Sequence, residues 1–194
     1  SLVAAGFDAV YVNRLGYADG GAAVEAEIVA TIGAQTPMLN GNATLATYDL
    51  RGYASELRTS GADLPSRESV LYPLRIGAGA GVYGEEHSES ERWYWAQSEA
   101  SFLLANPSAD DAKAAITGTI KVASPAATVQ VSVGGEVTTL RVVDGSAVLD
   151  LVVSAPAGAT DVTFTTDSAP TPTGTGDPRD LRLRIMDLRV SRLD

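Results

Sequence analysis

From about residue 70 to its end, the sequence is a series of short β-type runs separated by turn-forming residues. Apolar and polar residues alternate in runs such as ATVQVSV, which is typical of strands with one buried face. The interrupters include Asn106-Pro107, Gly134-Gly135, Asp144-Gly145 and the Pro-rich stretch 169–178. With no helical period between the runs, this pattern predicts a mainly β fold, an antiparallel, jelly-roll-like β-sandwich. The expected strands are VLYPLRI, RWYWAQ, EASFLLA, AAITGTIKVA, ATVQVSV, EVTTLRVV, SAVLDLVVS, TDVTFTT and DLRLRIMDLRV.

The first fifty residues predict a different unit, a strand, a helix and a second strand. Residues 7–12 alternate like a buried strand, and 20–33 form a helix capped by Asp19, because Val24, Ile28 and Ile32 repeat on one face. ATLATYDL follows as a strand. So small an α/β segment buries too little apolar surface to be stable alone, so we expect residues 1–50 to be the trailing part of a larger domain. Polar residues 51–69 are expected to be an irregular connection before a carbohydrate-binding-like sandwich at 70–194.

Charge and composition exclude several classes of function. The chain of 194 residues has a net charge of −10 and no concentrated basic stretch, so nucleic acid is a poor candidate partner. It has no cysteine, which excludes disulfides and thiolate chemistry. No run reaches the roughly 18 apolar residues of a membrane span.

The stretch EEHSESERWYWAQS holds both tryptophans and the one histidine of the chain. In a strand, Trp93 and Trp95 lie on one face, with Arg92 and Tyr94 on the other. Two indoles beside carboxylates make a plausible sugar platform, because the C–H face of a sugar ring stacks on an aromatic plane. The competing interpretation makes both tryptophans core anchors, with Arg92 and Tyr94 facing solvent.

The neighbouring acidic residues allow a similar choice. Glutamates 85, 86, 89 and 91 could supply a carboxylate pair or a cation site built on oxygen ligands, or they could simply face water. A structural cation stays open, although the EF-hand pattern is missing, and no cofactor is expected. His87 lacks a G-x-S-x-G serine to pair with. The glycine run RIGAGAGVYGEE lacks a phosphate-loop ending and predicts a tight, close-packed turn.

The carboxyl-terminal run DLRLRIMDLRV is expected to present a basic outer face. Leu183 and Ile185 point one way, while Arg182 and Arg184 point to solvent. Asp177 and Asp180 bracket Arg179 and are expected to pair with it.

Several spaced motifs resemble one family. They are Gly81, Tyr83 and Glu86 of a G-x-Y-x-x-E stretch, the strand with Arg92, Trp93 and Trp95, and the Asn106-Pro107 turn. With them, nearly the whole chain resembles the carboxyl-terminal extracytoplasmic region of large bacterial polytopic membrane proteins of cell-envelope polysaccharide assembly, which are similar to membrane glycosyltransferases and to sugar or phosphoglycerol transferases. The resemblance implies an accessory domain outside the membrane, an active site elsewhere in the parent chain, and no catalytic residue here.

The leading hypothesis is therefore a noncatalytic domain that binds envelope glycan and is tethered to the remainder of a membrane-embedded parent. The expected ligand-binding residues are Tyr83, Glu85, Glu86, Trp93, Tyr94 and Trp95. One alternative is the carboxyl-terminal part of a glycoside hydrolase-like enzyme with Asp8 and Glu85 as its carboxylates. Another is a purely structural or oligomerisation sandwich. Buried tryptophans would favour the last of these, and an aromatic patch beside carboxylates the first.

Overall fold

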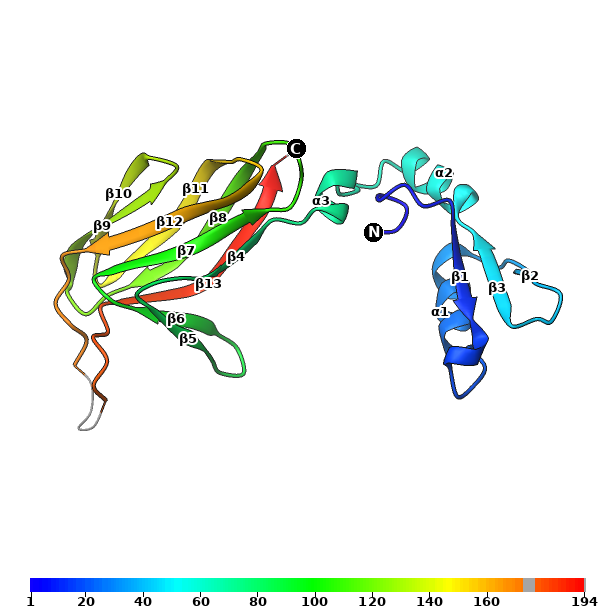
Figure 1. Cartoon of the computed structure of the whole chain (residues 1–194), viewed down its shortest axis with the longest axis horizontal. Coiled ribbons are helices and arrows are strands. Elements are labelled where there is room, and N and C mark those ends of the chain that lie inside the picture. Colours follow the sequence, from blue (N-terminus) through cyan, green and yellow to red (C-terminus); the bar gives the residue numbers. More distant parts are fainter. Residues whose placement is uncertain (173–176, 194) are drawn as a thin grey trace. The chain divides into compact units, whose positions relative to one another are not determined.

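The computed structural model describes residues 1–172 and 177–193 and divides the chain into two compact units, Ser1–Leu71 and Tyr72–Asp194. Figure 1 labels the elements of both. Residues 173–176 of the predicted Pro-rich turn lie outside the described residues. The division falls two residues beyond the expected start of the sandwich at residue 70.

The first unit is a three-stranded antiparallel sheet with helices. Its elements are β1 (Ala9–Asn13), the 3-10 helix η1 (Arg14–Gly16), α1 (Ala22–Ile32), β2 (Met38–Leu39), β3 (Leu45–Asp49), α2 (Arg51–Thr59) and α3 (Arg67–Leu71), and the sheet order is β1-β3-β2. The predicted helix is confirmed: Val24, Ile28 and Ile32 pack against the buried residues Val12, Ala46 and Tyr48. The Asp19 carboxylate accepts hydrogen bonds from the backbone N–H groups of Gly21 and Ala23.

Two local expectations for this region differ from the structure. Strand β1 has one buried face, with Val12 inside and Tyr11 69% exposed, because α1 covers only one side of the sheet. Residues 51–69 hold α2 and the start of α3, and α3 continues to Leu71, where a strand was predicted. The sequence pattern did not predict helix α2. Its apolar side consists only of Tyr53, Ala54 and Leu57, and three residues are too few to show a helical period.

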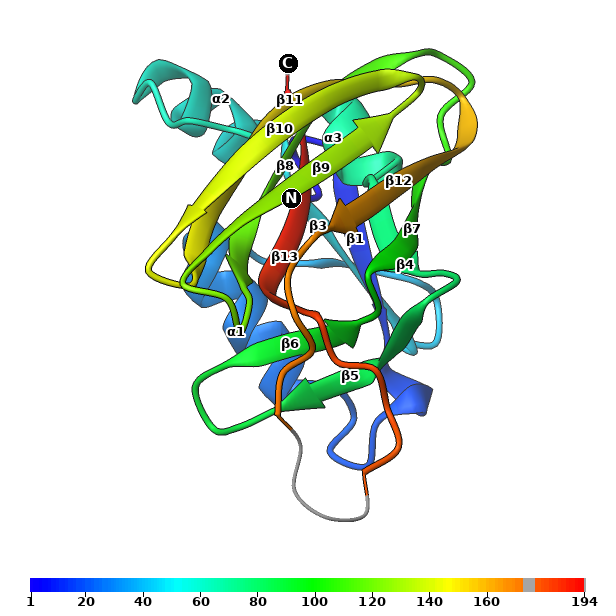
Figure 2. The ribbon, with the colours of Figure 1, turned by 90° about the vertical axis from the view of Figure 1, so that its left-hand side faces the viewer.

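The second unit contains ten antiparallel strands. They are β4 (Arg75–Ala78), β5 (Val82–His87), β6 (Arg92–Ala96), β7 (Glu99–Asn106), β8 (Ala112–Lys121), β9 (Ala126–Val133), β10 (Glu136–Val143), β11 (Ser146–Ala155), β12 (Gly158–Thr166) and β13 (Leu183–Leu193). Their order is β4-β7-β12-β9-β10-β11-β8-β13-β6-β5. Between β10 and β11 the only register pair is Val143 with Ser146, so the sheet folds over there into two layers. Strands β9, β10 and β12 lie in front of β8 and β13 in Figure 2.

Both layers supply the core. Phe102 of β7 and Phe164 of β12 pack with Ile116 of β8 and Ile185 of β13, and all four are at most 1% exposed. Phe102 makes edge-to-face contacts with Tyr94 of β6 and with Phe164, at ring-centroid distances of 5.4 and 5.6 Å. The predicted mainly β fold, an antiparallel sandwich of jelly-roll type, is confirmed.

Strand β5 is the main element that the sequence pattern failed to predict. Its residues VYGEEH contain a glycine and three consecutive polar residues, so they indicated a loop. The preceding turn is confirmed: Gly81 has φ +70°, and a Cβ atom there would lie 2.3 Å from the Glu99 carbonyl oxygen. Only glycine permits this close approach of β5 and β7.

Candidate functional site

The candidate site lies on the outer face of the layer that contains β5, β6 and β13. In the antiparallel register, Glu86 is opposite Trp93, Trp93 is opposite Met186, and Trp95 is opposite Arg184. Tyr94 and Ala96 alternate with the tryptophans and face the core. Both indoles are half-buried and outside the main core cluster. We call this surface the tryptophan face and define it as Tyr83, Glu86, Trp93, Trp95, Arg179 and Arg184.

Arg184 packs over the two indoles. Its guanidinium carbon lies 4.1 Å from the ring centroid of Trp93 and 5.8 Å from that of Trp95, which is cation–π geometry. The Trp93 indole N–H donates to Glu86 Oε2 at 3.2 Å. Trp93 is therefore fixed on one ring face by Arg184 and at its N–H by Glu86, and Trp95 is held less tightly.

A second arginine braces the neighbouring carboxylates. Arg179 donates to both oxygens of Asp177 and, through Nη1, to Glu86 Oε1 at 2.7 Å. Its guanidinium carbon also lies 5.5 Å from the Tyr83 ring centroid. These hydrogen bonds from Arg179 lower the pKa of the Asp177 carboxyl and raise that of Arg179 itself. Of the two predicted partners of Arg179, Asp177 is confirmed, whereas the Asp180 carboxylate pairs with Arg182 instead.

Tyr83 connects three segments. Its hydroxyl accepts hydrogen bonds from the backbone N–H of Asp180 at 3.1 Å and from Gln97 Nε2 at 3.3 Å. The bond from Asp180 fastens the segment before β13 to the β5–β6 hairpin across 97 residues of sequence. Tyr83 and Glu86 thus both belong to the face that holds the two tryptophans.

Two of the six predicted ligand-binding residues lie on the opposite side of their strands. Tyr94 packs in an edge-to-face contact with Phe102, and its burial raises the pKa of its phenol. The expectation that Tyr94 faces solvent while the indoles are buried in the core is wrong: the orientation is reversed, because Tyr94, not Trp93, shares the side of Ala96. Glu85 is the register partner of Tyr94 and lies away from the tryptophan face.

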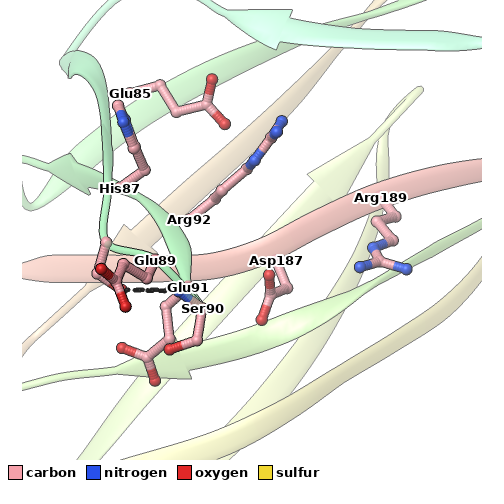
Figure 3. A pocket seen from close by; sticks show the side chains of 9 residues that line it. Glu85, His87, Glu89, Ser90, Glu91, Arg92, Asp187 and Arg189 are labelled. Carbon is pink, nitrogen blue, oxygen red and sulfur yellow. Dashed lines mark hydrogen bonds between the residues drawn. The ribbon is translucent and has the colours of Figure 1, made fainter.

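Glu85 lines an open cleft of about 490 Å³ between the end of the β5–β6 hairpin and the bulge of β13. Figure 3 shows Glu85, His87 and Arg92 near one another, with Asp187 and Arg189 contributed by β13. The hairpin turn is closed locally, since Ser88 Oγ accepts from the backbone N–H of Glu91. Acidic and basic side chains are mixed here, and nowhere in the described residues do three or more His, Asp or Glu side chains gather as a metal site.

The remaining candidates are placed apart. Asp8 lies in the first unit and Glu85 in the second, so the two carboxylates of the glycosidase alternative belong to different units. His87 is exposed, and across residues 1–172 and 177–193 no hydrogen bond joins it to a serine. A membrane-crossing helix is likewise not found among the described residues.

Arg184 and Arg179 belong to the site but were not among the residues predicted from the sequence to bind a ligand. The alternation in LRLRI did indicate that Arg184 is on the outer face of a strand. It did not indicate that β13 pairs with β6, which is what brings Arg184 onto the indoles.

No protein-family model matches the sequence, and no curated protein matches it. Among solved structures, a family 35 carbohydrate-binding module from Clostridium thermocellum is similar at 9% identity and a TM-score of 0.35, over 63% of this chain and 93% of that one. A family 35 module from Cellvibrio japonicus has 11% identity and a TM-score of 0.37, over 62% and 93%. A ruminal GH26 endo-β-1,4-mannanase has 14% identity and a TM-score of 0.37, over 57% of this chain and 21% of that one.

Proposed function

We propose that the second unit is a noncatalytic glycan-binding domain and that the tryptophan face is its binding surface. The observation that carries the proposal is the position of Trp93 and Trp95, which lie together outside the main core, beside the Glu86 carboxylate. An indole plane stacks on the C–H face of a sugar ring, and a carboxylate accepts hydrogen bonds from hydroxyl groups. This combination suits a polar ligand with apolar ring faces.

The two tryptophans have different roles in this proposal. The ring of Trp93 is already covered by Arg184, and its indole N–H already donates to Glu86. Trp95 makes the longer contact with Arg184 and has no hydrogen bond from its indole N–H among the described residues. Trp95 is therefore the stacking platform, and Trp93 positions Arg184 and Glu86 beside it.

A noncatalytic role agrees with the placement of the glutamates. Glycosidases use two carboxylates that face one substrate from either side of the bond to be cleaved. Glu85 and Glu86 are adjacent on β5, so their side chains point to opposite faces of the strand. Arg179 and Trp93 already hold Glu86 by hydrogen bonds. Holding a polymer without cleaving it would raise its effective concentration near another active site.

The test is an NMR titration of the whole chain with oligosaccharides of different composition, including arabinan, galactan and mannan fragments. The chain has two tryptophans, so two indole N–H signals report on this face. We expect both signals to shift with one class of glycan, with a Kd of about 1 mM. Trp95→Ala should weaken binding at least about tenfold and Trp95→Phe less, because a smaller ring keeps part of the stacking.

The control is Val137→Ala, at a 59% exposed position on β10 in the other layer, which should bind like the parent chain. Thermal unfolding of each variant shows whether the fold is kept. Unchanged indole signals with every glycan, or equal affinity in Trp95→Ala, would contradict the proposal.

We further propose that this domain lies outside the cytoplasmic membrane as part of a bacterial envelope-polysaccharide protein. The support is the resemblance carried by Gly81, Tyr83, Glu86 and the tryptophan strand. Because the sequence has no cysteine, Thr138→Cys on exposed β10 adds a single thiol to this region of the complete gene product. A membrane-impermeant maleimide should label it in intact cells, with a cysteine in a cytoplasmic loop as the control. Labelling only after lysis would show that the domain lies in the cytoplasm and would contradict the proposal.

A further inference from the structure

We propose that the glycan held by the tryptophan face carries an anionic group, a sugar carboxylate, and that Arg184 and Lys121 receive it. The inference rests on the proposed function and adds the chemical class of the ligand. It starts from a row of register partners that crosses four strands of the layer containing β5, β6 and β13. The row is Trp95 on β6, Arg184 on β13, Lys121 on β8 and Ser146 on β11.

Arg184 differs from its neighbours in how it is held. Arg179 donates hydrogen bonds to Asp177 and Glu86. Arg182 donates to Asp180 and to the Ser168 carbonyl oxygen. Arg184 donates no hydrogen bond within residues 1–172 and 177–193, and its one ionic contact is Glu91 at 3.6 Å. Its Nε is buried without a hydrogen-bond partner. Stacking on the indoles fixes the plane of the guanidinium. Because the terminal Nη groups donate no hydrogen bond within the described residues, their N–H groups can donate to a ligand.

Lys121 adds a second cation beside it. The two residues are Cα partners on adjacent antiparallel strands, which puts their Cβ atoms about 5 Å apart. Lys121 is exposed and forms no ion pair in the described part of the chain. Like charges directly opposite each other in a sheet are destabilising. An anion bound between them would remove that repulsion.

The neighbouring row strengthens the case for a local anion site. Its members are Glu86, Trp93, Met186, Thr119 and Val148, and its one carboxylate, Glu86, already accepts hydrogen bonds from Arg179 and from the Trp93 indole N–H. A guanidinium presents two parallel N–H groups that match a carboxylate, whereas an ammonium acts as a point charge. A sugar ring stacked on Trp95 would place a carboxylate substituent toward Arg184, the next residue in the row.

The experiment measures binding of the whole chain to matched pairs of ligands by NMR titration at low salt. The probes are trigalacturonate against galactotriose, and glucose 6-phosphate against glucose, so that a carboxylate and a phosphate are compared separately. We expect trigalacturonate to bind at least about tenfold more tightly than galactotriose, and this preference to fall as salt screens the charges. The phosphate pair should show a smaller preference, because the 6-phosphate sits on a flexible C6–O arm that must be ordered on binding, whereas the carboxylate is attached directly to the sugar ring.

Lys121→Gln should reduce the preference for trigalacturonate several-fold and leave galactotriose affinity unchanged. Arg184→Lys, which keeps the charge and loses the planar donor pair, should also reduce this preference. Because Arg184 stacks on both indoles, unchanged galactotriose affinity is expected of Lys121→Gln alone. Lys113→Gln is the matched control, since Lys113 is exposed on the same strand β8 but pairs with Leu193, away from the tryptophans. Lys121 is exposed, so its replacement tests the site even where an Arg184 variant folds poorly.

The outcomes separate the two proposals. Equal affinity for trigalacturonate and galactotriose would overturn the anionic-ligand inference and leave glycan binding intact. A preference that survives Lys121→Gln and Arg184→Lys would also overturn it, because the anion would then bind elsewhere. A larger preference in the phosphate pair would replace the carboxylate with a phosphate as the ligand of this site. Binding to neither sugar of either pair would overturn the inference together with the glycan-binding proposal for these ligands.

Discussion

At the scale of single residues, one carboxylate organises the first unit. Glu25 of α1 accepts hydrogen bonds from Arg14 Nε at 2.6 Å, from Arg14 Nη2 at 2.8 Å and from the Tyr48 hydroxyl at 2.7 Å. Helix α1 is thereby tied to η1 and to β3. The hydrogen bonds from Arg14, followed by that from Tyr48, lower the pKa of Glu25 to about 2.

This shift predicts acid sensitivity of the first unit. A carboxyl whose pKa is lower in the folded state stabilises the fold at pH values above its unfolded pKa of 4.5, and the stabilisation is lost as the pH falls toward 2. Glu25→Gln should destabilise the unit at pH 7 and flatten the dependence of its unfolding midpoint on pH over this range. Amide hydrogen exchange of α1 residues measures it. Glu27→Gln, on the same helix and without an ion pair in the described residues, should leave the dependence unchanged; an equal loss in both variants would contradict the assignment.

Gly81 makes a second prediction at this scale. Its φ of +70° and the approach of the Glu99 carbonyl leave no room for a side chain. Gly81→Ala should therefore destabilise the second unit by at least about 2 kcal/mol. Gly84→Ala on β5 is the control, because a Cβ atom there meets nothing within 4 Å. Chemical denaturation followed by tryptophan fluorescence compares them, and similar midpoints would show that the turn can shift without cost.

At the scale of elements, local patterns predicted most strands but not their neighbours. Alternation identified β6 and the side on which Trp93 and Trp95 lie together, because the period of two is a local property. The pairing of β6 with β13 joins residues such as Trp95 and Arg184 that are far apart in sequence, and no local pattern encodes it. Strand β5 was missed because its pairing with β6, rather than its own polar sequence, stabilises it. The sequence could not predict that the indoles lie on the outer face either, since either face of β6 could have packed against the core.

The contact between the two layers yields a prediction for an element. Phe102 of β7 packs between Tyr94 of one layer and Phe164 of its own, and it is 1% exposed. Phe102→Ala should cost about 3–5 kcal/mol of the free energy of unfolding of the second unit, because it opens a cavity between the layers. Leu103→Ala, at the next position and 45% exposed, should change it by less than about 0.5 kcal/mol. Equal effects measured by urea denaturation would contradict the layered core.

At the scale of the whole molecule, the chain has two cores that share no residue. One lies within the sandwich, and the other holds Val12, Ala46 and Tyr48 of the first unit. Both tryptophans, Arg184 and Lys121 belong to the second unit, so every residue of the proposed binding surface comes from residues 72–194. Glycan binding is thus assigned to the second unit, and the acid sensitivity that Glu25 confers is assigned to the first.

This division predicts that residues 72–194 fold and bind without the first unit. The ten strands and their core lie entirely within that range, so its removal from the rest of the chain breaks no strand pair of the sandwich. The isolated fragment should keep the tryptophan emission maximum, the urea midpoint of that emission and the glycan affinity of the whole chain, each within experimental error. Lowering the pH from 4.5 toward 2 should affect α1 amide exchange in the whole chain even where the tryptophan signal is unchanged. A fragment that is unfolded, or that binds the same glycan at least about tenfold more weakly, would show that the first unit contributes to the stability or the binding surface of the sandwich.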